Sequence, residues 1–194
     1  MNLFYFVKYQ IVRHTDAMQD SRNVIDKYKG VLLDAIVSDL DANGIELEIA
    51  VENLTRDFNM GTIVRSANAF GVRHVHVVGS RQWNKRGAMM TDKYLHIHYY
   101  ATVEEFLSFN AEKEIIAIDN VENSTDLSST SLPRRAIFVF GSEGDGLSDD
   151  LLSGARTIIS IEQFGSTRSL NVGVAAGVVM YEWLRQHKLK RTDT

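Results

Sequence analysis

Short apolar runs alternate with segments of helical periodicity along most of the chain. The run IELEIAV at residues 45–51 alternates apolar and acidic side chains, which predicts a strand with one face exposed to solvent. Four further runs are short and rich in β-branched side chains, which is typical of buried strands. These four runs are residues 74–79, 115–119, 136–141 and 157–161.

Segments with a period of about 3.6 residues lie between these runs and predict helices. They cover residues 22–40, 60–70, 102–109, 147–155 and 170–187. Strands that alternate with helices need crossover connections, so the sequence predicts an α/β fold, a mostly parallel sheet with helices on both faces. Ligands of such sheets bind beyond the carboxyl ends of the strands. The loops of interest therefore follow residues 51, 79, 119, 141 and 161.

Composition narrows the class of protein. The chain has 194 residues, 44% of them apolar, which is enough for one domain with a full core. It contains no cysteine, which excludes disulfides, thiolate zinc sites and a cysteine nucleophile and suits a cytoplasmic location. No apolar run approaches the roughly 18 residues of a membrane span, and the first residues lack the pattern of a signal peptide. Because the formal charge is −4, any nucleic-acid partner must be bound by local patches.

One basic patch follows the second predicted strand. Residues 79–98 contain four basic side chains against one acidic side chain, Asp92, with Trp83 and Tyr94 between them. Basic residues interleaved with aromatic ones are suited to follow a phosphate backbone and to stack bases. The same composition is also that of an ordinary solvated loop. The basic residues are Arg81, Lys85, Arg86 and Lys93.

The segment at residues 53–71 leads from a polar loop into the second predicted helix. Asn59 is suited to cap the start of that helix with its side chain. Arg65 follows less than two turns later and is expected to share the neighbourhood of apolar positions such as Ile63 and Val64. Because arginine is rarely buried without a partner, we expect Arg65 to meet an anion, either a carboxylate of this chain or a phosphate of a ligand.

The glycine-rich segment FVFGSEGDGL at residues 138–147 joins a strand to a helix. Its spacing is not the G-x-G-x-x-G of dinucleotide sites and no Lys-Ser/Thr pair follows, so a phosphate cradle is not indicated. The turn instead permits close approach of the backbone and contains one carboxylate, Glu143. A simple strand-to-helix turn has the same composition.

The last predicted helix carries unusually small side chains, Gly173, Ala175, Ala176 and Gly177. Glycine inside a helix costs about 0.5–1 kcal/mol relative to alanine. Small residues on this surface therefore predict that another helix, a neighbouring subunit or a ligand approaches it closely.

Two further groups of residues have simpler interpretations. The pairs His74/His76 and His96/His98 each place two imidazoles on one face of a strand. A zinc site would need a third ligand and a position for water, so no metal is expected there. We interpret the Met89–Met90 pair as packing residues.

Taken together, these segments resemble the SpoU (TrmH-type) RNA 2′-O-ribose methyltransferases of the SPOUT class. The resemblance is carried by Asn59-x₅-Arg65 followed by AFGV, by VFGSEGDGLS, and by I-x-Q-F-G-S-x-x-SLNV, in that order at the ends of three strands. The loop RQWNKRGAMMTDKY is also similar to the family. The resemblance extends over about residues 45–187.

This resemblance implies a SPOUT-type S-adenosylmethionine-binding methyltransferase domain at residues 45–194, preceded by an N-terminal arm and helix at residues 1–44. It implies that the last two motifs form a deep trefoil knot that holds the cofactor, an α/β knot. It also implies a homodimer with the active site between the subunits. Contacts to the cofactor, mostly through the backbone, are then expected at Gly141, Ile161 and Leu170.

The remaining site residues are assigned by their positions in the motifs. The functional arginine of the family corresponds to Arg65 and its motif asparagine to Asn59, and the other polar site residues correspond to Glu143, Ser169 and Asn171. Because a guanidinium rarely gives up its proton, we expect Arg65 to orient a phosphate and to stabilise developing negative charge.

The implied activity is transfer of a methyl group from S-adenosylmethionine to a ribose 2′-hydroxyl of a structured RNA, tRNA rather than rRNA, in the cytoplasm. RNA contacts are expected at Arg81, Lys85 and Arg86, and neither a metal nor a membrane is involved. One departure from the family is Glu162, which stands where many members have proline and would add a negative charge at the rim of the cofactor pocket. The other is length, because only about 44 residues precede the first motif strand, too few for the separate RNA-binding domain of larger members.

Two rival hypotheses come from other functional classes. A non-catalytic RNA-binding or assembly protein would retain the fold and lose the activity, although the motif residues are all present together. A small-molecule or nucleotide enzyme on a doubly wound sheet would be expected to bind dinucleotides, and the missing G-x-G-x-x-G argues against that.

Overall fold

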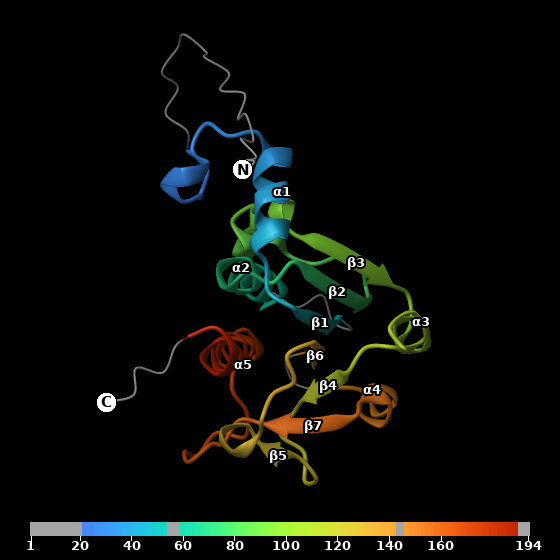
Figure 1. Ribbon diagram of the computed structural model, residues 1–194. Coiled ribbons are helices and arrows are strands. Elements are labelled where there is room, and N and C mark those ends of the chain that lie inside the picture. The colour runs from blue at the N-terminus through green and yellow to red at the C-terminus, as the bar shows by residue number, and fades with distance from the viewer. Residues whose placement is uncertain (1–20, 54–58, 143–145, 190–194) are drawn as a thin grey trace, which may run out of the picture.

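The computed structural model describes residues 21–53, 59–142 and 146–189. Their strands form one seven-stranded sheet in the order β3-β2-β1-β6-β4-β7-β5, and every neighbouring pair is parallel. Figure 1 shows this sheet passing through the middle of the molecule. The strands are β1 (Leu47–Asn53), β2 (His74–Gly79), β3 (His96–Tyr100), β4 (Ile115–Ile118), β5 (Thr125–Asp126), β6 (Ala136–Phe140) and β7 (Thr157–Ser160).

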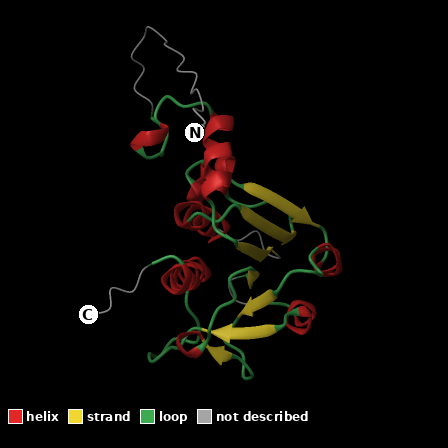
Figure 2. Cartoon of the chain, in the orientation of Figure 1, coloured by secondary structure: helices red, strands yellow, loops and turns green. Residues whose placement is uncertain are grey.

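Helices cover both faces of the sheet, with α2 and α5 on one face and α3 and α4 on the other (Figures 1 and 2). The predicted α/β class is therefore confirmed. None of the helices in the described part of the chain is long and apolar enough to cross a membrane. The helices are α1 (Leu33–Asn43), α2 (Asn59–Phe70), α3 (Val103–Phe109), α4 (Asp149–Gly154) and α5 (Val172–His187), with short 3-10 turns η1 (Asp26–Tyr28), η2 (Lys85–Ala88), η3 (Thr91–Tyr94) and η4 (Leu127–Ser129).

Each face of the sheet has its own apolar layer. Along β6, Phe138 and Phe140 join the cluster beneath α2 and α5, whereas Ile137 and Val139 join the cluster beneath α3 and α4. Successive side chains of a strand point to opposite faces, so a strand covered on both faces must be apolar at every position. This explains the continuous apolar runs that identify the buried strands in the sequence.

Strand β1 departs from its prediction, because it is central and buried rather than half-exposed. It lies between β2 and β6, and Glu52 is only 1% exposed. The Glu52 carboxylate accepts a hydrogen bond from the backbone N–H of Ser148 at 2.8 Å. The acidic positions of this strand thus find partners inside the fold, which is what makes their burial tolerable.

Two other element boundaries differ from the sequence pattern. The helix predicted over residues 22–40 begins only at Leu33, because Gly30 has a φ of +71° and interrupts it. The residues before Leu33 form a loop in which the Arg22 guanidinium donates to the carbonyls of Tyr28 and Val31. Strands β3 and β5 are not among the five predicted strands, because β3 contains a single aliphatic side chain, Ile97, and β5 contains only Thr125 and Asp126.

Candidate functional site

A cavity of about 580 Å³ opens at the carboxyl ends of β4, β6 and β7. This is the edge at which open parallel sheets bind their ligands. Residues that follow the three strands form its wall together with the first turn of α5. The lining consists of Ile118, Asp119, Asn120, Phe140, Gly141, Ser142, Gly146, Ile161, Gln163, Arg168, Ser169, Leu170, Asn171, Val172 and Ala175.

The turn after β6 brings two stretches of backbone into direct contact. A Cβ atom on Gly141 would lie 2.2 Å from the carbonyl carbon of Gly146, so only glycine fits at position 141. Gly146 itself has a φ of +71°, and its N–H donates to the carbonyl of Ser142 at 3.2 Å. The Asp119 carboxylate accepts the N–H of Leu147 at 2.9 Å. The loop after β4 and the turn after β6 are therefore fixed to each other.

The opposite wall of the cavity is the start of α5. The side-chain oxygen of Asn171 accepts the N–H groups of Gly173 and Val174 at 3.0 and 3.2 Å and so caps the helix. Its amide nitrogen donates to Asn59 Oδ1 at 2.9 Å, which joins the cavity wall to the start of α2. A Cβ on Gly173 would lie 3.0 Å from Thr62 Cγ2, so the two helices are in close contact at this point.

Two buried polar atoms in the lining, Ser142 Oγ and Gln163 Oε1, have no hydrogen-bond partner among the described residues. An unpaired buried polar group costs about 1–3 kcal/mol, so both atoms are suited to bind a ligand. Among the described lining residues Arg168 is the only cation, and Ile161 and Leu170 supply apolar surface. The cavity thus favours a flat group that accepts and donates hydrogen bonds over a polyphosphate.

Most of the residues that the motifs single out lie together in this cavity. Gly141, Ile161, Ser169, Leu170 and Asn171 all line it. Asn59 reaches it through its hydrogen bond with Asn171 and is the first residue of α2 rather than the residue before it. Glu143 lies outside the described residues.

Arg65 differs from its prediction. Its side chain is exposed, it is absent from the lining of the cavity, and it has no hydrogen bond or ion pair with a described residue. The expected apolar neighbourhood is wrong because the buried positions of α2, such as Ile63, Val64 and Ala67, lie on the face toward the sheet. Arg65 lies on the outer stripe of the helix together with Thr62.

Sequence reasoning missed five polar residues of the cavity, namely Asp119, Asn120, Ser142, Gln163 and Arg168. Asp119 and Ser142 each occupy the first or second position after a buried strand, which is the signal that identifies them. Gln163 lies inside the third motif, at a position that the resemblance leaves without a role.

Glu162 is outside the cavity rather than at its rim. Its carboxylate points to a separate groove and accepts the N–H of Ser128 at 3.2 Å. This hydrogen bond lowers the pKa of Glu162. The expectation that Glu162 places a negative charge on the cofactor pocket is therefore wrong, because successive residues leaving β7 point in different directions.

The small residues of α5 separate into two groups. Close approach is confirmed at Gly173, which meets α2, whereas a Cβ on Gly177 would have no described atom within 4 Å. Around Gly177 an apolar groove of about 520 Å³ is open, with Val174, Val178 and Tyr181 exposed on its α5 side. In this structure, α5 thus presents an uncovered apolar face.

The basic loop between β2 and β3 is anchored rather than freely solvated. Trp83 and Tyr94 are only 9% and 7% exposed, so these two aromatic rings are core residues and are not available to stack bases. Arg81 lies over the ring of Tyr99 at 4.8 Å, and Lys85 pairs with Asp92 at 3.0 Å. Arg86 is exposed.

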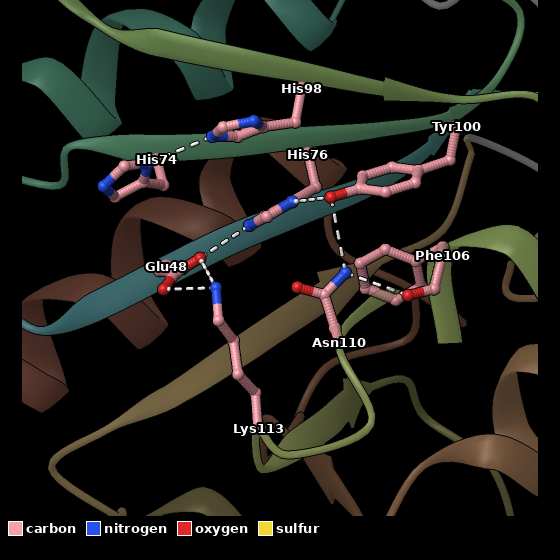
Figure 3. Close-up of polar contacts among 8 residues, drawn as sticks. All are labelled: Glu48, His74, His76, His98, Tyr100, Phe106, Asn110 and Lys113. Atoms are coloured by element: carbon pink, nitrogen blue, oxygen red, sulfur yellow. Dashed lines mark hydrogen bonds and ion pairs between the residues drawn. The ribbon is translucent and has the colours of Figure 1, made fainter. Parts of the chain in front are cut away.

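The four histidines form one cluster that neither pair alone predicts, and Figure 3 shows three of them, His74, His76 and His98. Rings from β2 and β3 alternate, with ring centroids 5.0–5.3 Å apart, in the order His96, His74, His98 and His76. His76 then contacts Tyr100, whose hydroxyl lies 3.2 Å from His76 Nδ1. No group of three or more potential ligands suited to a metal ion occurs in the described ranges.

The same cluster contains an ion-paired carboxylate. Glu48 Oε2 lies 2.7 Å from both His76 Nε2 and Lys113 Nζ (Figure 3). Partial burial raises the pKa of Glu48, but the hydrogen bonds from His76 and Lys113 outweigh it and hold that pKa at about 2. Burial, followed by the charges of His76 and His74, lowers the pKa of His98 to about 4.

Comparison with known proteins identifies the same family that the sequence motifs resemble. Residues 46–181 match the SpoU rRNA Methylase family. The 23S rRNA (guanosine-2′-O-)-methyltransferase RlmB of Neisseria meningitidis is 31% identical over 194 aligned positions, which cover 88% of this chain and 76% of that protein. The tRNA (guanosine(18)-2′-O)-methyltransferase of Escherichia coli K12 is 27% identical over 148 positions, which cover 74% of this chain. This chain spans 65% of the length of the Escherichia coli relative.

Solved structures agree on the fold. An AdoMet-bound rRNA methyltransferase from Sinorhizobium meliloti superposes with a TM-score of 0.67 at 25% identity. The superposition covers 75% of this chain and 57% of that one.

Proposed function

The chain belongs to the SpoU rRNA Methylase family, and from this premise we propose that it transfers a methyl group from S-adenosylmethionine to a ribose 2′-hydroxyl of a structured RNA. The observation that carries the proposal is the convergence of the second and third motifs on one cavity, in which Gly141, Ile161 and Leu170 lie side by side with Ser169 and Asn171. The names of the relatives include both a tRNA and an rRNA methyltransferase. We propose tRNA as the first substrate and rRNA as the second, both in the cytoplasm.

The residues of the cavity fit this cofactor. S-adenosylmethionine has an adenosine and no phosphate, and it supplies an electrophilic methyl group on a positively charged sulfur. Ser142 Oγ and Gln163 Oε1 have no partner among the described residues and would hydrogen-bond the edge of an adenine, and Gly141 lets the turn close against Gly146 at the wall of the cavity. The Asp119 carboxylate is fixed by the backbone N–H groups of Leu147 and Asn120 and adds negative charge at the wall. This lining needs no cluster of cations, because the cofactor carries no polyphosphate.

The proposed chemistry is an in-line displacement in which the chain positions the reacting groups. The ribose oxygen gains the methyl group, the carbon–sulfur bond breaks, and the hydroxyl proton leaves to water or to an RNA phosphate. Ser169 and Asn171 fix the wall beside the reacting centre, and the Asn59–Asn171 hydrogen bond holds that wall against α2. Arg65 binds an RNA phosphate and stabilises the negative charge that develops on the ribose oxygen.

The exposed position of Arg65 supports a site completed by a second copy of this chain. Arg65 is absent from the lining of its own cavity, and the apolar groove beside Val174, Val178 and Tyr181 is uncovered. We propose that α5 packs against a second subunit through this groove, and that Arg65 of one subunit acts at the cavity of its partner.

The domain organisation and the knot belong to the same proposal. Residues 45–194 form the methyltransferase domain and residues 1–44 an N-terminal arm, which is supported by the start of the family match at residue 46. We propose the trefoil knot from the resemblance, and it is consistent with a cavity that is lined by residues following β4, β6 and β7, namely residues 118–120, residues 141, 142 and 146, and residues 161, 163 and 168–171.

One experiment tests the reaction class. The purified protein is incubated with labelled S-adenosylmethionine and unmodified total RNA, and the RNA is digested to nucleosides and separated. We expect a 2′-O-methylnucleoside with the wild type and none with Arg65→Ala. Arg156→Ala, which removes another exposed arginine, serves as the matched control and should retain activity. A methyl group on a base would overturn the ribose assignment, and cofactor binding without any transfer would favour the non-catalytic RNA-binding alternative.

A mixing experiment tests the shared site. Arg65→Ala and Asn171→Ala are each expected to lack activity when alone. If each site combines Arg65 of one subunit with the cavity of the other, subunit exchange between the two variants restores one intact site per mixed dimer. A wild-type protein that sediments as a monomer while active would overturn the dimer.

A further inference from the structure

The turn between η2 and η3 holds two methionines in an unusual conformation. Met89 has a φ of +48° and Met90 a φ of +64°, whereas such left-handed conformations are normally taken by glycine or asparagine. Both side chains are exposed, Met89 by 52% and Met90 by 58%. Their interpretation as packing residues is therefore wrong. Two strained residues in succession persist only where the surrounding structure imposes them, and such positions concentrate at functional sites.

The turn is closed by a buried hydrogen bond and lies against the backbone of α2. The hydroxyl of buried Thr91 donates to the carbonyl of Ala88 at 2.6 Å, which closes the turn from within. A Cβ on Gly61 would lie 2.8 Å from the backbone nitrogen of Ala88, so the backbones of α2 and η2 touch. These contacts connect the backbone on both sides of the two exposed methionines to the rest of the fold.

Helix α2 connects the methionine loop with α5, because two successive residues of its first turns contact these two elements. Gly61 of α2 meets the loop at Ala88, and the next residue, Thr62, meets Gly173 of α5. Arg65 lies four positions after Gly61 and three after Thr62. Residues at these spacings are neighbours on a helix surface, so Arg65 lies one turn further along the same side of α2. The exposed side chain of Arg65 therefore starts on the side of α2 whose preceding turn contacts the loop at Ala88 and α5 at Gly173.

The charges beside Met89 and Met90 indicate which kind of ligand would bind there. Arg86 and Lys93, on either side of the methionines, are exposed and have no side-chain partner among the described residues. Asp92, the acidic residue of the loop, is already paired with Lys85. Two apolar side chains bordered by unpaired cations match a single-stranded nucleic acid, whose bases have apolar faces and whose backbone is anionic.

We propose that Met89 and Met90 bind the face of an unstacked base next to the target ribose, while Arg86 and Lys93 hold the flanking phosphates. This proposal deepens the methyltransferase proposal and rests on it for the identity of the target. The two methionines act as positioning residues, because they fix the RNA strand against α2 so that its ribose meets Arg65 and the cavity. The thioether chains suit this task because they adapt to any base without selecting one.

The test variant is Met89→Gly/Met90→Gly, because glycine adopts the left-handed conformation and the turn keeps its backbone path. Met89→Leu/Met90→Leu retains the apolar surface. Phe109→Ser removes an apolar side chain that is 75% exposed on α3, on the other face of the sheet, and serves as the control. For each protein we measure the Kd for unmodified tRNA and rRNA fragments, KM and kcat for methyl transfer, the Kd for S-adenosylmethionine, and the sedimentation coefficient.

We expect the glycine variant to raise Kd and KM for RNA about tenfold, the effect of losing one stacked base. The affinity for S-adenosylmethionine and the sedimentation coefficient should be unchanged, and the leucine variant and Phe109→Ser should behave as the wild type. An unchanged Kd for RNA overturns the proposal, and so does a changed oligomeric state without a change in RNA affinity. A wild type that binds RNA without methylating it, and loses that binding in the glycine variant, overturns the methyltransferase and supports the base-binding surface.

Discussion

The two polar regions of this molecule differ in how completely their atoms are paired. In the cavity at the carboxyl ends of β4, β6 and β7, Ser142 Oγ and Gln163 Oε1 have no partner among the described residues. In the cluster near the amino ends of β1 and β2, the Glu48 carboxylate is shared by Lys113 and by His76, which also contacts Tyr100 (Figure 3). Both regions contain side chains that commonly act in catalysis, yet only the first leaves buried atoms without a partner.

The presence or absence of a hydrogen-bond partner distinguishes polar groups that stabilise the fold from those available to bind a ligand. A polar group that is hydrogen-bonded within the protein gains little from a ligand, because ligand binding would first break the existing hydrogen bond. An unpaired buried atom gains its partner only when a ligand arrives. By this criterion the four histidines and Glu48 hold β1, β2 and β3 together, whereas the cavity, which contains two of the four unpaired buried side-chain atoms in the described residues, is our candidate for ligand binding.

The largest expected effect is at the turn that closes the cavity. In Gly141→Ala the added Cβ would collide with the backbone of Gly146, so we expect loss of cofactor binding and a free energy of unfolding lower by about 3 kcal/mol. Isothermal titration with S-adenosylmethionine and urea unfolding measure the two effects. Gly165→Ala, with no described atom within 4 Å of its new Cβ, is the control, and equal behaviour of the two variants would contradict the close contact.

The next largest effect is on stability alone. Glu48→Gln leaves Lys113 and His76 without their carboxylate, so we expect the free energy of unfolding at pH 7 to fall by about 2 kcal/mol. Because the pKa of Glu48 is lowered from 4.5 to about 2, its contribution is complete above about pH 4.5 and is lost as the pH falls toward 2. Urea unfolding across this range measures it. A loss of cofactor affinity in this variant would break the distinction between the two regions.

A smaller effect on stability is expected from His98, and it falls in a higher pH range than the effect of Glu48. The pKa of His98 is lowered from 6.5 to about 4, so the unfolded chain binds a proton at higher pH than the folded protein does. Stability is therefore complete above about pH 6.5 and decreases as the pH falls toward 4, by roughly 1 kcal/mol for this half-exposed ring. His98→Phe keeps a stacked ring without the titration and should flatten the stability curve between pH 6.5 and 4. An equally steep curve in His98→Phe would assign the loss to other groups.

The smallest expected effect is at Glu162. Its carboxylate binds the N–H of Ser128 and lies outside the cavity, so Glu162→Gln should leave the Kd for S-adenosylmethionine within about twofold of the wild type. A charge at the rim of the pocket would instead change that Kd with ionic strength. Titrations of both proteins at low and high salt distinguish the two cases.

Much of the fold and part of the site could be predicted from the sequence. All five predicted strands are present, and β4 and β6 show the clearest signal, because a strand covered on both faces leaves a continuous apolar run. Gly141 is recognisable in its motif because the backbone of Gly146 leaves no space for a Cβ there, and Gly173 because the helix packs closely against Thr62. Their spacing in the motifs is therefore enough to locate the cavity along the chain.

What could not be predicted depends on register and on helix phase. Glu48 finds His76 only because β1 pairs with β2 in a register that sets Ala50 beside His76, and a slip by one residue would turn each side chain to the other face. Arg65 is one position away from the buried Val64, and that single step of the helix decides between core and solvent. The exposure of Met89 and Met90 follows from their left-handed backbone, for which their residue type gives no sign.

The position of β1 also has a consequence for how the protein forms during synthesis. One neighbour of β1 is β2, but Leu47 on its other side pairs with Ala136, almost half the chain later. No neighbouring pair in this sheet can close as a local hairpin, so folding must wait for distant contacts and is expected to be slow. A nascent chain can assemble β1, β2 and β3 while one edge of β1 has no partner. Until the ribosome releases β6, that open edge is the place where two unfinished chains would join.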